Sequence, residues 1–279
     1  MRQTRFWAIL HKIRSLVQTM ESYPGDKGWE DHTRREIRRF FAGIIVMAVF
    51  ISGSVWLSLI LTGTSILPLW PFVPYAGPFG VYLAWLFYDV VSVLIILGAI
   101  SFVVTALVCV TCTAAGLHYA LAQRIATNET PEVVKDVVLM HQQLRDVARD
   151  LITLFDGNLA HIMASSFCNS LFATIQVLAN DVTSSTFALL LPVVVIFLQL
   201  SHYSQELFDS SLKLQRAAFH AATGGTVAFL EARALNLVIL VAGTPPTLHC
   251  KGLGQLSLAD AGKAFRQFYS TVSVLGPKY

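Results

Sequence analysis

The amino-acid sequence predicts an all-α membrane protein, a polytopic helical bundle of about five spans. Hydrophobic residues make up 54% of the chain and charged residues 13%, whereas soluble domains average roughly 45–50% and about 25%. Asp89 is the only charged residue between Phe40 and Gln123, and this stretch is too long for one span of about 20 residues. Basic residues are also concentrated in alternate loops, as in multi-span proteins. Together these observations exclude a soluble globular fold.

Residues 1–39 are predicted to form a cytosolic amphipathic, basic segment. Apolar residues recur there at helical spacing, but Arg2, Arg5, Lys12 and Arg14 interrupt them. The segment therefore lacks the continuous apolar region of a cleaved signal peptide. It is either a helix on the membrane surface or the cytosolic end of a spanning helix.

Residues 40–202 are predicted to form the transmembrane bundle. An uncharged, proline-rich loop, 62–80, separates the first two spans, and a charged cytosolic loop, 120–149, precedes the third. The second span is longer than a bilayer is thick, so we expect it to tilt or to extend into the cytosol. The predicted spans are 40–61, 81–119, 159–178 and 186–200.

Residues 203–255 are predicted to be cytosolic. A helix from 227 to 241 is expected between two breaks in this segment, the Gly224-Gly225 pair and the Pro245-Pro246 pair.

Residues 256–279 contain a last helix, 256–275, that has one apolar and one polar face. Both stripes recur every three or four residues. The apolar stripe consists of Ala261, Phe265, Phe268, Val272 and Leu275, and the polar stripe of Lys263, Arg266, Ser270 and Ser273. A polar face in a lipid-embedded chain must contact protein or water, so this helix is a candidate for a subunit interface or a water path. A helix lying on the membrane surface is the alternative.

Loop charges predict the orientation of the chain. The first 39 residues contain nine Lys or Arg, the 62–80 loop none, the 124–149 segment four, the 180–185 turn none and the 203–235 segment three. Because basic loops stay in the cytosol, we expect a cytosolic N-terminus and an extracellular C-terminus.

No pattern in the sequence indicates an enzyme, a metal site or a cofactor. Cys109 and Cys112 form a CxxC, but it lies in an apolar run without a second cysteine pair. The eight histidines are scattered, and no catalytic or phosphate-loop motif is present. The basic residues form no dense patch, so a nucleic-acid partner is not expected.

Three stretches of the second half occur in a characteristic order. They are HQQLRDVARDLITLFDGNLAHIMASSFCNSLF, FLQLSHYSQELFDSSLKLQRAAF and ALNLVILVAGTPPTLHCKGLGQLSLADAGKAFRQFYSTVSVL. In this order they resemble the C-terminal half of the insect odorant receptor family. The proline-rich, aromatic loop 67–79 also matches the outer loop ahead of that family's fourth helix. The resemblance covers roughly residues 1–276, although Gly224-Gly225 and the Thr244–Cys250 string are atypical.

This resemblance implies a subunit of a tetrameric ligand-gated cation channel in the plasma membrane. The bundle then resembles the C-terminal five helices of the family's seven-helix fold, as in an N-terminally truncated tuning receptor. Residues 203–255 become a cytosolic anchor, and residues 256–279 supply a pore-lining helix and an external C-terminus. The implied partners are an odorant molecule, a co-receptor in a hetero-tetramer and the lipid bilayer.

The resemblance also implies site residues. The family's odorant pocket lies in the outer half of the bundle, and its aromatic lining with a few hydroxyls suits a small, volatile, apolar ligand. The corresponding residues here are Ser52, Trp56, Tyr82, Trp85, Tyr88, Phe187 and Leu191. The alternative for each aromatic is helix packing or anchoring at the interface. For the pore and gate, the register of Tyr269-Ser270 points to Phe268, Val272 and Leu275, with Val272 at the narrowest point.

Two alternative functions predict other sequence features. A gustatory receptor-like channel subunit shares the topology, but its C-terminal signature is not evident. A fragment of a secondary transporter predicts inverted repeats and broken helices, and the sequence has no such internal symmetry.

Overall fold

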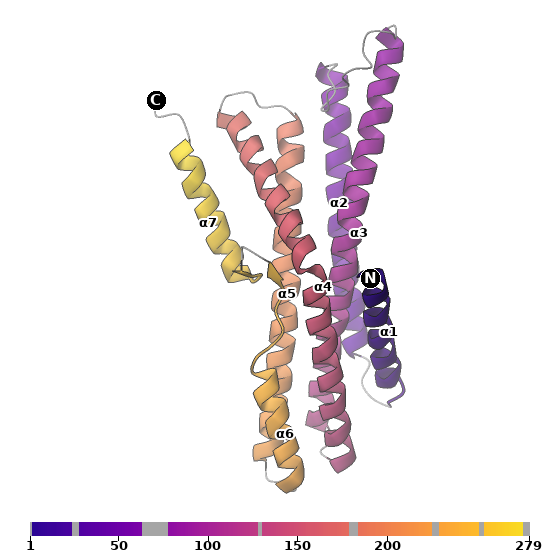
Figure 1. The fold of residues 1–279 in the computed structure, drawn as a ribbon, viewed down its shortest axis with the longest axis vertical. Helices are drawn as coiled ribbons and strands as arrows, with labels where there is room; N and C mark the ends of the chain where they lie inside the picture. The colour runs from indigo at the N-terminus through magenta and orange to yellow at the C-terminus, as the bar shows by residue number, and fades with distance from the viewer. Residues whose placement is uncertain are drawn as a thin grey trace. The chain divides into compact units, whose positions relative to one another are not determined.

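The computed structural model describes residues 2–23, 28–62, 78–127, 130–178, 184–224, 229–250 and 254–275. Within these residues the chain forms seven helices and one small hairpin (Figure 1). The elements are α1 (Arg2–Glu21), α2 (Gly28–Thr62), α3 (Pro78–Thr127), α4 (Pro131–Leu178), α5 (Ser184–Thr223), α6 (Phe229–Ala242), β1 (His249–Cys250), β2 (Gly254–Gln255) and α7 (Leu258–Leu275). The predicted all-α architecture is confirmed.

Local signals in the sequence set several helix ends. α4 begins at Pro131, which suits the first helical position because its missing N–H needs no partner there. The Thr130 carbonyl accepts the first helical bond from the Val134 amide at 3.0 Å. At the end of α6 the Gly243 amide still donates to the Ile239 carbonyl, at 3.0 Å, and two prolines then follow.

All four helices that contain a predicted span are longer than that span, and α2 and α5 also cross the predicted segment boundaries at residues 40 and 202. α2 begins at Gly28, so residue 40 lies inside a continuous helix, and α5 continues past residue 202 to Thr223. In the added part of α5, Leu207, Leu214 and Ala218 are buried at helical spacing. This periodic apolar stripe maintains the helix beyond the uncharged region.

The hairpin lies in the connection between α6 and α7, where the sequence predicted no strand. β1 and β2 pair antiparallel, with His249 opposite Gln255 and Cys250 opposite Gly254. Gly254 has a φ of +86°, which a glycine adopts without strain. The preceding Leu248 is fully buried, and its amide donates to the Ser204 hydroxyl of α5 at 3.1 Å. Leu248 therefore holds this connection against α5.

The chain divides into two compact units, and α2, α3, α4 and α5 each contribute residues to both. Unit 1 comprises Met1–Phe40, Ala106–Ala160 and Gln199–Ala261. Within it α6 lies alongside the C-terminal half of α5, where the Gln215 side chain donates to the Ile239 carbonyl at 3.1 Å (Figure 1). Its core includes fully buried leucines from three helices: Leu107, Leu144, Leu151, Leu200 and Leu207.

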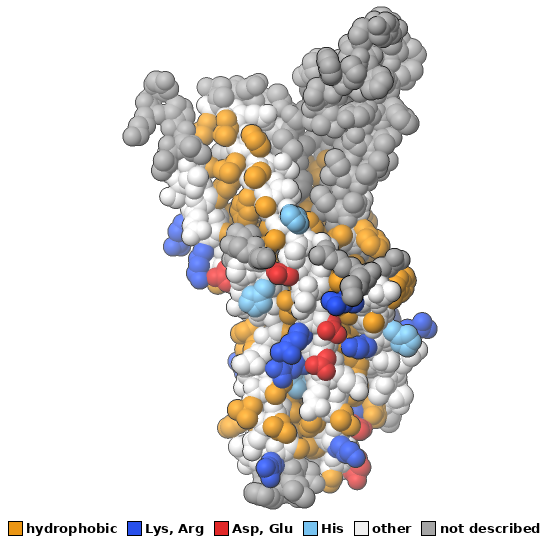
Figure 2. All heavy atoms as spheres, in the orientation of Figure 1, with side chains coloured by type: hydrophobic (Ala, Val, Ile, Leu, Met, Phe, Trp, Pro, Cys, Tyr) orange, Lys and Arg blue, Asp and Glu red, His pale blue; other side chains and the backbone are white. Residues whose placement is uncertain are grey.

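Unit 2 comprises Phe41–Thr105, His161–Leu198 and Gly262–Tyr279. Its described helices expose large apolar side chains, among them Val46, Val49, Phe102 and Phe172, each more than 60% exposed. Figure 2 shows hydrophobic side chains gathered over the C-terminal half of α4. Exposed apolar surface of this extent is typical of helices that face lipid.

Two helical stretches among the described residues are long and apolar enough to cross a membrane. They are Gly28–Ser54 on α2 and Ser101–Thr127 on α3.

Candidate functional site

A serine cap fixes the start of α7, the helix that contains the predicted gate. The Ser257 hydroxyl accepts a hydrogen bond from the Asp260 amide at 3.1 Å and lies 2.8 Å from the Asp260 carboxylate. The Ser257 hydroxyl thus gives a hydrogen-bond partner to an amide of the first turn that has none within the helix, and the Asp260 carboxylate places a negative charge near the helix N-terminus. The beginning of α7 is therefore well defined.

The two faces of α7 differ in burial. Phe265, Phe268 and Val272 are partly buried, whereas the side chains of the predicted polar stripe are exposed: Lys263, Arg266, Ser270 and Ser273. The Ser273 hydroxyl donates to the Ser270 carbonyl of its own helix at 2.8 Å, so the stripe needs no other protein partner for this group. The side chain of Leu275 lies outside the described residues.

Aromatic contacts hold α7 within unit 2. The Phe265 ring packs edge-to-face on Phe197 of α5 with a centroid distance of 5.6 Å, and Phe197 packs likewise on Phe167 of α4 at 5.7 Å. Such pairs add about 0.5–1.5 kcal/mol to the burial of the rings. α7 thus packs on α5 through its apolar stripe, and Phe265 belongs to this packing contact.

The structure places the predicted ligand residues on three helices of unit 2. Ser52 is on α2 and its side chain is exposed. The side chains of the other six lie outside the described residues, although their backbone belongs to α2, α3 and α5: Trp56, Tyr82, Trp85, Tyr88, Phe187 and Leu191. The pocket stays a prediction for this reason.

A carboxylate in unit 1 joins α3 and α4 to the segment that follows α1. Asp136 of α4 accepts hydrogen bonds from the Arg124 guanidinium of α3 at 3.1 Å and from the Tyr23 hydroxyl after α1 at 3.0 Å. The Arg124 guanidinium also lies over the Tyr23 ring, 3.4 Å from its centroid. Asp136 and Arg124 therefore satisfy each other's charge.

A second cluster in unit 1 links α2 to α5. Glu36 of α2 is buried and pairs with Arg39, while its carbonyl accepts from the Tyr203 hydroxyl of α5 at 3.1 Å. Burial raises the pKa of Tyr203 further above the neutral range, in which its hydroxyl is already protonated and can donate. The Tyr203 ring also packs edge-to-face on Phe40.

Two buried histidines form a further pair in unit 1. His118 of α3 and His141 of α4 lie edge-to-face with centroids 5.7 Å apart. His118 Nδ1 donates to the Ala114 carbonyl at 2.8 Å, whereas neither ring nitrogen of His141 has a hydrogen-bond partner. No three His, Cys, Asp or Glu side chains in the described ranges lie close enough to hold a metal ion.

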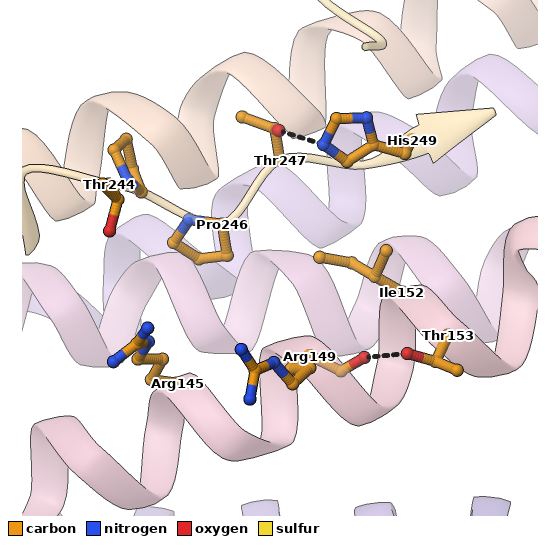
Figure 3. A pocket seen from close by; sticks show the side chains of 9 residues that line it. Arg145, Arg149, Ile152, Thr153, Thr244, Pro246, Thr247 and His249 are labelled. Carbon is orange, nitrogen blue, oxygen red and sulfur yellow. Dashed lines mark hydrogen bonds between the residues drawn. The ribbon is translucent and has the colours of Figure 1, made fainter. Parts of the chain in front are cut away.

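Sequence reasoning missed a polar recess in unit 1, between α4 and the connection that follows α6 (Figure 3). Arg145 and Arg149 lie on one side of it, and Thr244, Thr247 and His249 on the other. The two arginines are four residues apart on one helix, a spacing that places them on the same face. That spacing can be read from the sequence. The opposite wall of the recess cannot, because it comes from a segment distant in the chain.

Comparisons with known proteins fit this architecture. The family model described as "7tm Odorant receptor" matches residues 1–222. The solved structure of the insect olfactory receptor OR5 from Machilis hrabei is similar in fold, with a TM-score of 0.74 and 12% sequence identity over 98% of this chain and 76% of that one. A search of curated proteins found no match.

Proposed function

Because this chain belongs to the 7tm Odorant receptor family, we propose that it binds small volatile ligands and gates a cation pore together with a co-receptor. The family match over residues 1–222 is the observation that carries the proposal. Membership in this family makes the chain a membrane protein and a receptor, not an enzyme.

The proposed ligand site is the aromatic set in the outer half of the bundle. Trp56, Trp85 and Tyr88 offer apolar rings with polar edges, which suit a small apolar molecule that carries one polar group. Trp85→Ala should shift the odorant dose–response curve to at least about tenfold higher concentration, because it removes a large contact surface. Trp7→Ala is the matched control, since Trp7 on α1 is 62% exposed. An unchanged curve for Trp85→Ala would exclude this residue from the site.

The proposed gate is Val272 on α7, with Leu275 one turn further along. An apolar ring closes a pore by excluding water, and widening it admits hydrated cations, so the gate itself needs no charge. Support comes from the register of Tyr269-Ser270 and from the apolar side chain of Val272, which is only partly buried and so keeps an accessible surface. Val272→Ser should raise the leak current, whereas Ser273→Val on the exposed stripe should change expression more than conduction.

Cysteine accessibility separates this gate from the opposite assignment. Cysteines at 272 and 275 should react with aqueous thiol reagents in the open state. If they are protected while cysteines at 266 and 273 react, the polar stripe lines the pore instead.

The proposed partner is a co-receptor subunit in a hetero-tetramer, in the plasma membrane. Currents evoked by odorants in cells with and without the co-receptor test this directly. A current of equal size without the co-receptor would contradict the proposed assembly.

A further inference from the structure

The recess beside α4 presents two positive charges without an acidic partner. Figure 3 shows Arg145 and Arg149 on the side of α4 that faces Thr244, Pro246 and Thr247. Neither guanidinium forms an ion pair or hydrogen bond with another described residue. The nearest carboxylates along α4 are Asp146 and Asp150, and Asp150 is already paired with Lys12 at 3.2 Å.

The positive charge of Arg145 affects the pKa of a neighbouring histidine. The pKa of His141, one turn earlier on α4, is lowered to about 4, first by burial and then by the positive charge of Arg145. Arg145 is half-buried, so water screens this charge incompletely. A half-buried cation without a counter-ion attracts an anion.

The hydroxyl groups of the recess are already engaged. Thr153 donates to the Arg149 carbonyl at 2.9 Å, Thr244 donates to the Val241 carbonyl at 3.1 Å, and Thr247 lies 3.2 Å from His249 Nε2. The guanidinium N–H groups therefore remain as the principal donors. Their planar forks match the oxygens of a phosphate or a carboxylate.

The size of the recess limits what can enter it. Its volume is about 220 Å³, below the roughly 300–1,000 Å³ of pockets for drug-sized ligands. A second recess of about 290 Å³ adjoins it through Arg149 and Thr153, and Arg5 of α1 lines that one. Three arginines line the two small adjoining recesses, and the one carboxylate among the lining residues, Asp150, is paired with Lys12. The excess positive charge suits a compact anion with more than one negative charge better than a single carboxylate.

We propose that the recess between α4 and residues 244–249 binds a phosphate monoester through Arg145 and Arg149. Arg5 provides additional positive charge at the adjoining recess. The ligand joins α4 to the connection that leads into the hairpin, and this connection is already tied to α5 through Leu248 and Ser204. Occupancy therefore stabilises the packing of unit 1. The phosphate can belong to a phosphoinositide headgroup or to a soluble phosphate ester.

Binding to the full chain tests the site. The purified chain is placed in phosphatidylcholine nanodiscs and titrated with radiolabelled inositol trisphosphate, and inorganic phosphate and acetate serve as competitors. We expect saturable binding that inorganic phosphate displaces and acetate does not. The Arg145→Gln/Arg149→Gln double variant should lose about tenfold or more in affinity, the effect of removing charge-assisted hydrogen bonds. Arg216→Gln is the charge-matched control, because exposed Arg216 lines neither recess.

A second arm identifies the source of the phosphate. Nanodiscs that contain phosphatidylinositol bisphosphate are compared with phosphatidylcholine alone, and bound lipid is counted by native mass spectrometry. If the chain retains phosphoinositide and binds the soluble ester only weakly, the ligand is a lipid headgroup. If it binds the soluble ester and retains no phosphoinositide, the ligand is a soluble ester.

Three results would overturn the proposal: unchanged affinity in the double variant, an equal loss in Arg216→Gln, or equal competition by acetate. Arg149→Lys guards against misfolding, because Arg149 is exposed and lysine keeps the charge. We expect Arg149→Lys to weaken binding severalfold through loss of the planar fork while gel-filtration behaviour stays unchanged. Wild-type affinity in this variant would show that the planar guanidinium of Arg149 is not needed to recognise the phosphate.

Discussion

Gly116 on α3 lies against Thr33 and Trp29 of α2 within unit 1. A Cβ at this position would lie 2.1 Å from Thr33 Oγ1 and 3.4 Å from Thr33 Cβ. Thr33 is buried, and a β-branched side chain in a helix has few alternative rotamers. Gly116 is therefore required by packing between the two helices.

Gly116→Ala should lower the stability of the protein by about 1–3 kcal/mol, the usual cost of overpacking a core. The midpoint of thermal unfolding, followed by fluorescence-detected gel filtration, measures this. Gly157→Ala on α4 is the control with the opposite sign. A Cβ there meets nothing within 4 Å, so alanine should stabilise the helix by about 0.5–1 kcal/mol. Equal shifts in the two variants would contradict the packing argument.

His141 makes the stability of unit 1 depend on pH. Burial, and then Arg145, lower its pKa from 6.5 to about 4. Because the folded pKa is depressed, the neutral form contributes its full stability above pH 6.5 and loses it as the pH falls towards 4. The loss over this window is on the order of 2–3 kcal/mol.

His141→Leu should lessen the fall of the thermal unfolding midpoint between neutral pH and pH 4 without abolishing it, since it removes one of the two buried histidines, His118 and His141, that lie side by side. His220→Leu is the control, because His220 on α5 is exposed. A decline with falling pH that is as steep in His141→Leu as in the wild type would show that another group causes it.

At the scale of single elements, local sequence signals predicted much of the fold. Pro131, the Gly224 break and the prolines after Gly243 mark helix ends in the structure close to where the sequence predicts them. The hairpin was not predictable, because its two-residue strands are too short to show a period and the preceding Leu248 is held by Ser204, which is distant in the sequence. The recess at Arg145 was not predictable either, because burial and the opposite wall arise only from tertiary packing.

Ser257→Ala should fray the first turn of α7. It removes the acceptor for the Asp260 amide, a loss of about 1 kcal/mol for an N-cap. Hydrogen exchange should therefore accelerate at the amides of the first turn of α7. Ser15→Ala in the middle of α1 is the control, since Ser15 is exposed and its hydroxyl donates to the Lys12 carbonyl of the same helix. Exchange at α7 that stays as slow as in the wild type would show that the hairpin alone fixes this helix start.

At the scale of the whole molecule, the charges of the loops predict the orientation of the chain. The N-terminal segment, the 124–149 segment and the 203–235 segment hold most of the basic residues, and the 62–80 loop holds none. Because basic loops stay in the cytosol, this pattern predicts that the 62–80 loop lies outside the cell and residues 124–149 inside. On this predicted orientation the recess at Arg145 lies on the cytosolic side, where phosphate esters are available.

Glycosylation tests this orientation in both directions. Asn128-Glu129-Thr130 is the only Asn-x-Ser/Thr site in the sequence and lies at the predicted cytosolic side, so it should carry no glycan. The double variant Pro71→Asn/Val73→Thr creates a site in the predicted outer loop and should gain one. A change in electrophoretic mobility after endoglycosidase treatment shows whether either site carries a glycan. Each site serves as the control for the other. A glycan at Asn128 with none at the new site would invert the topology, because the same enzyme acts only on the luminal face that becomes extracellular. It would also move the Arg145 recess outside the cell, where a cytosolic-leaflet phosphoinositide could not reach it.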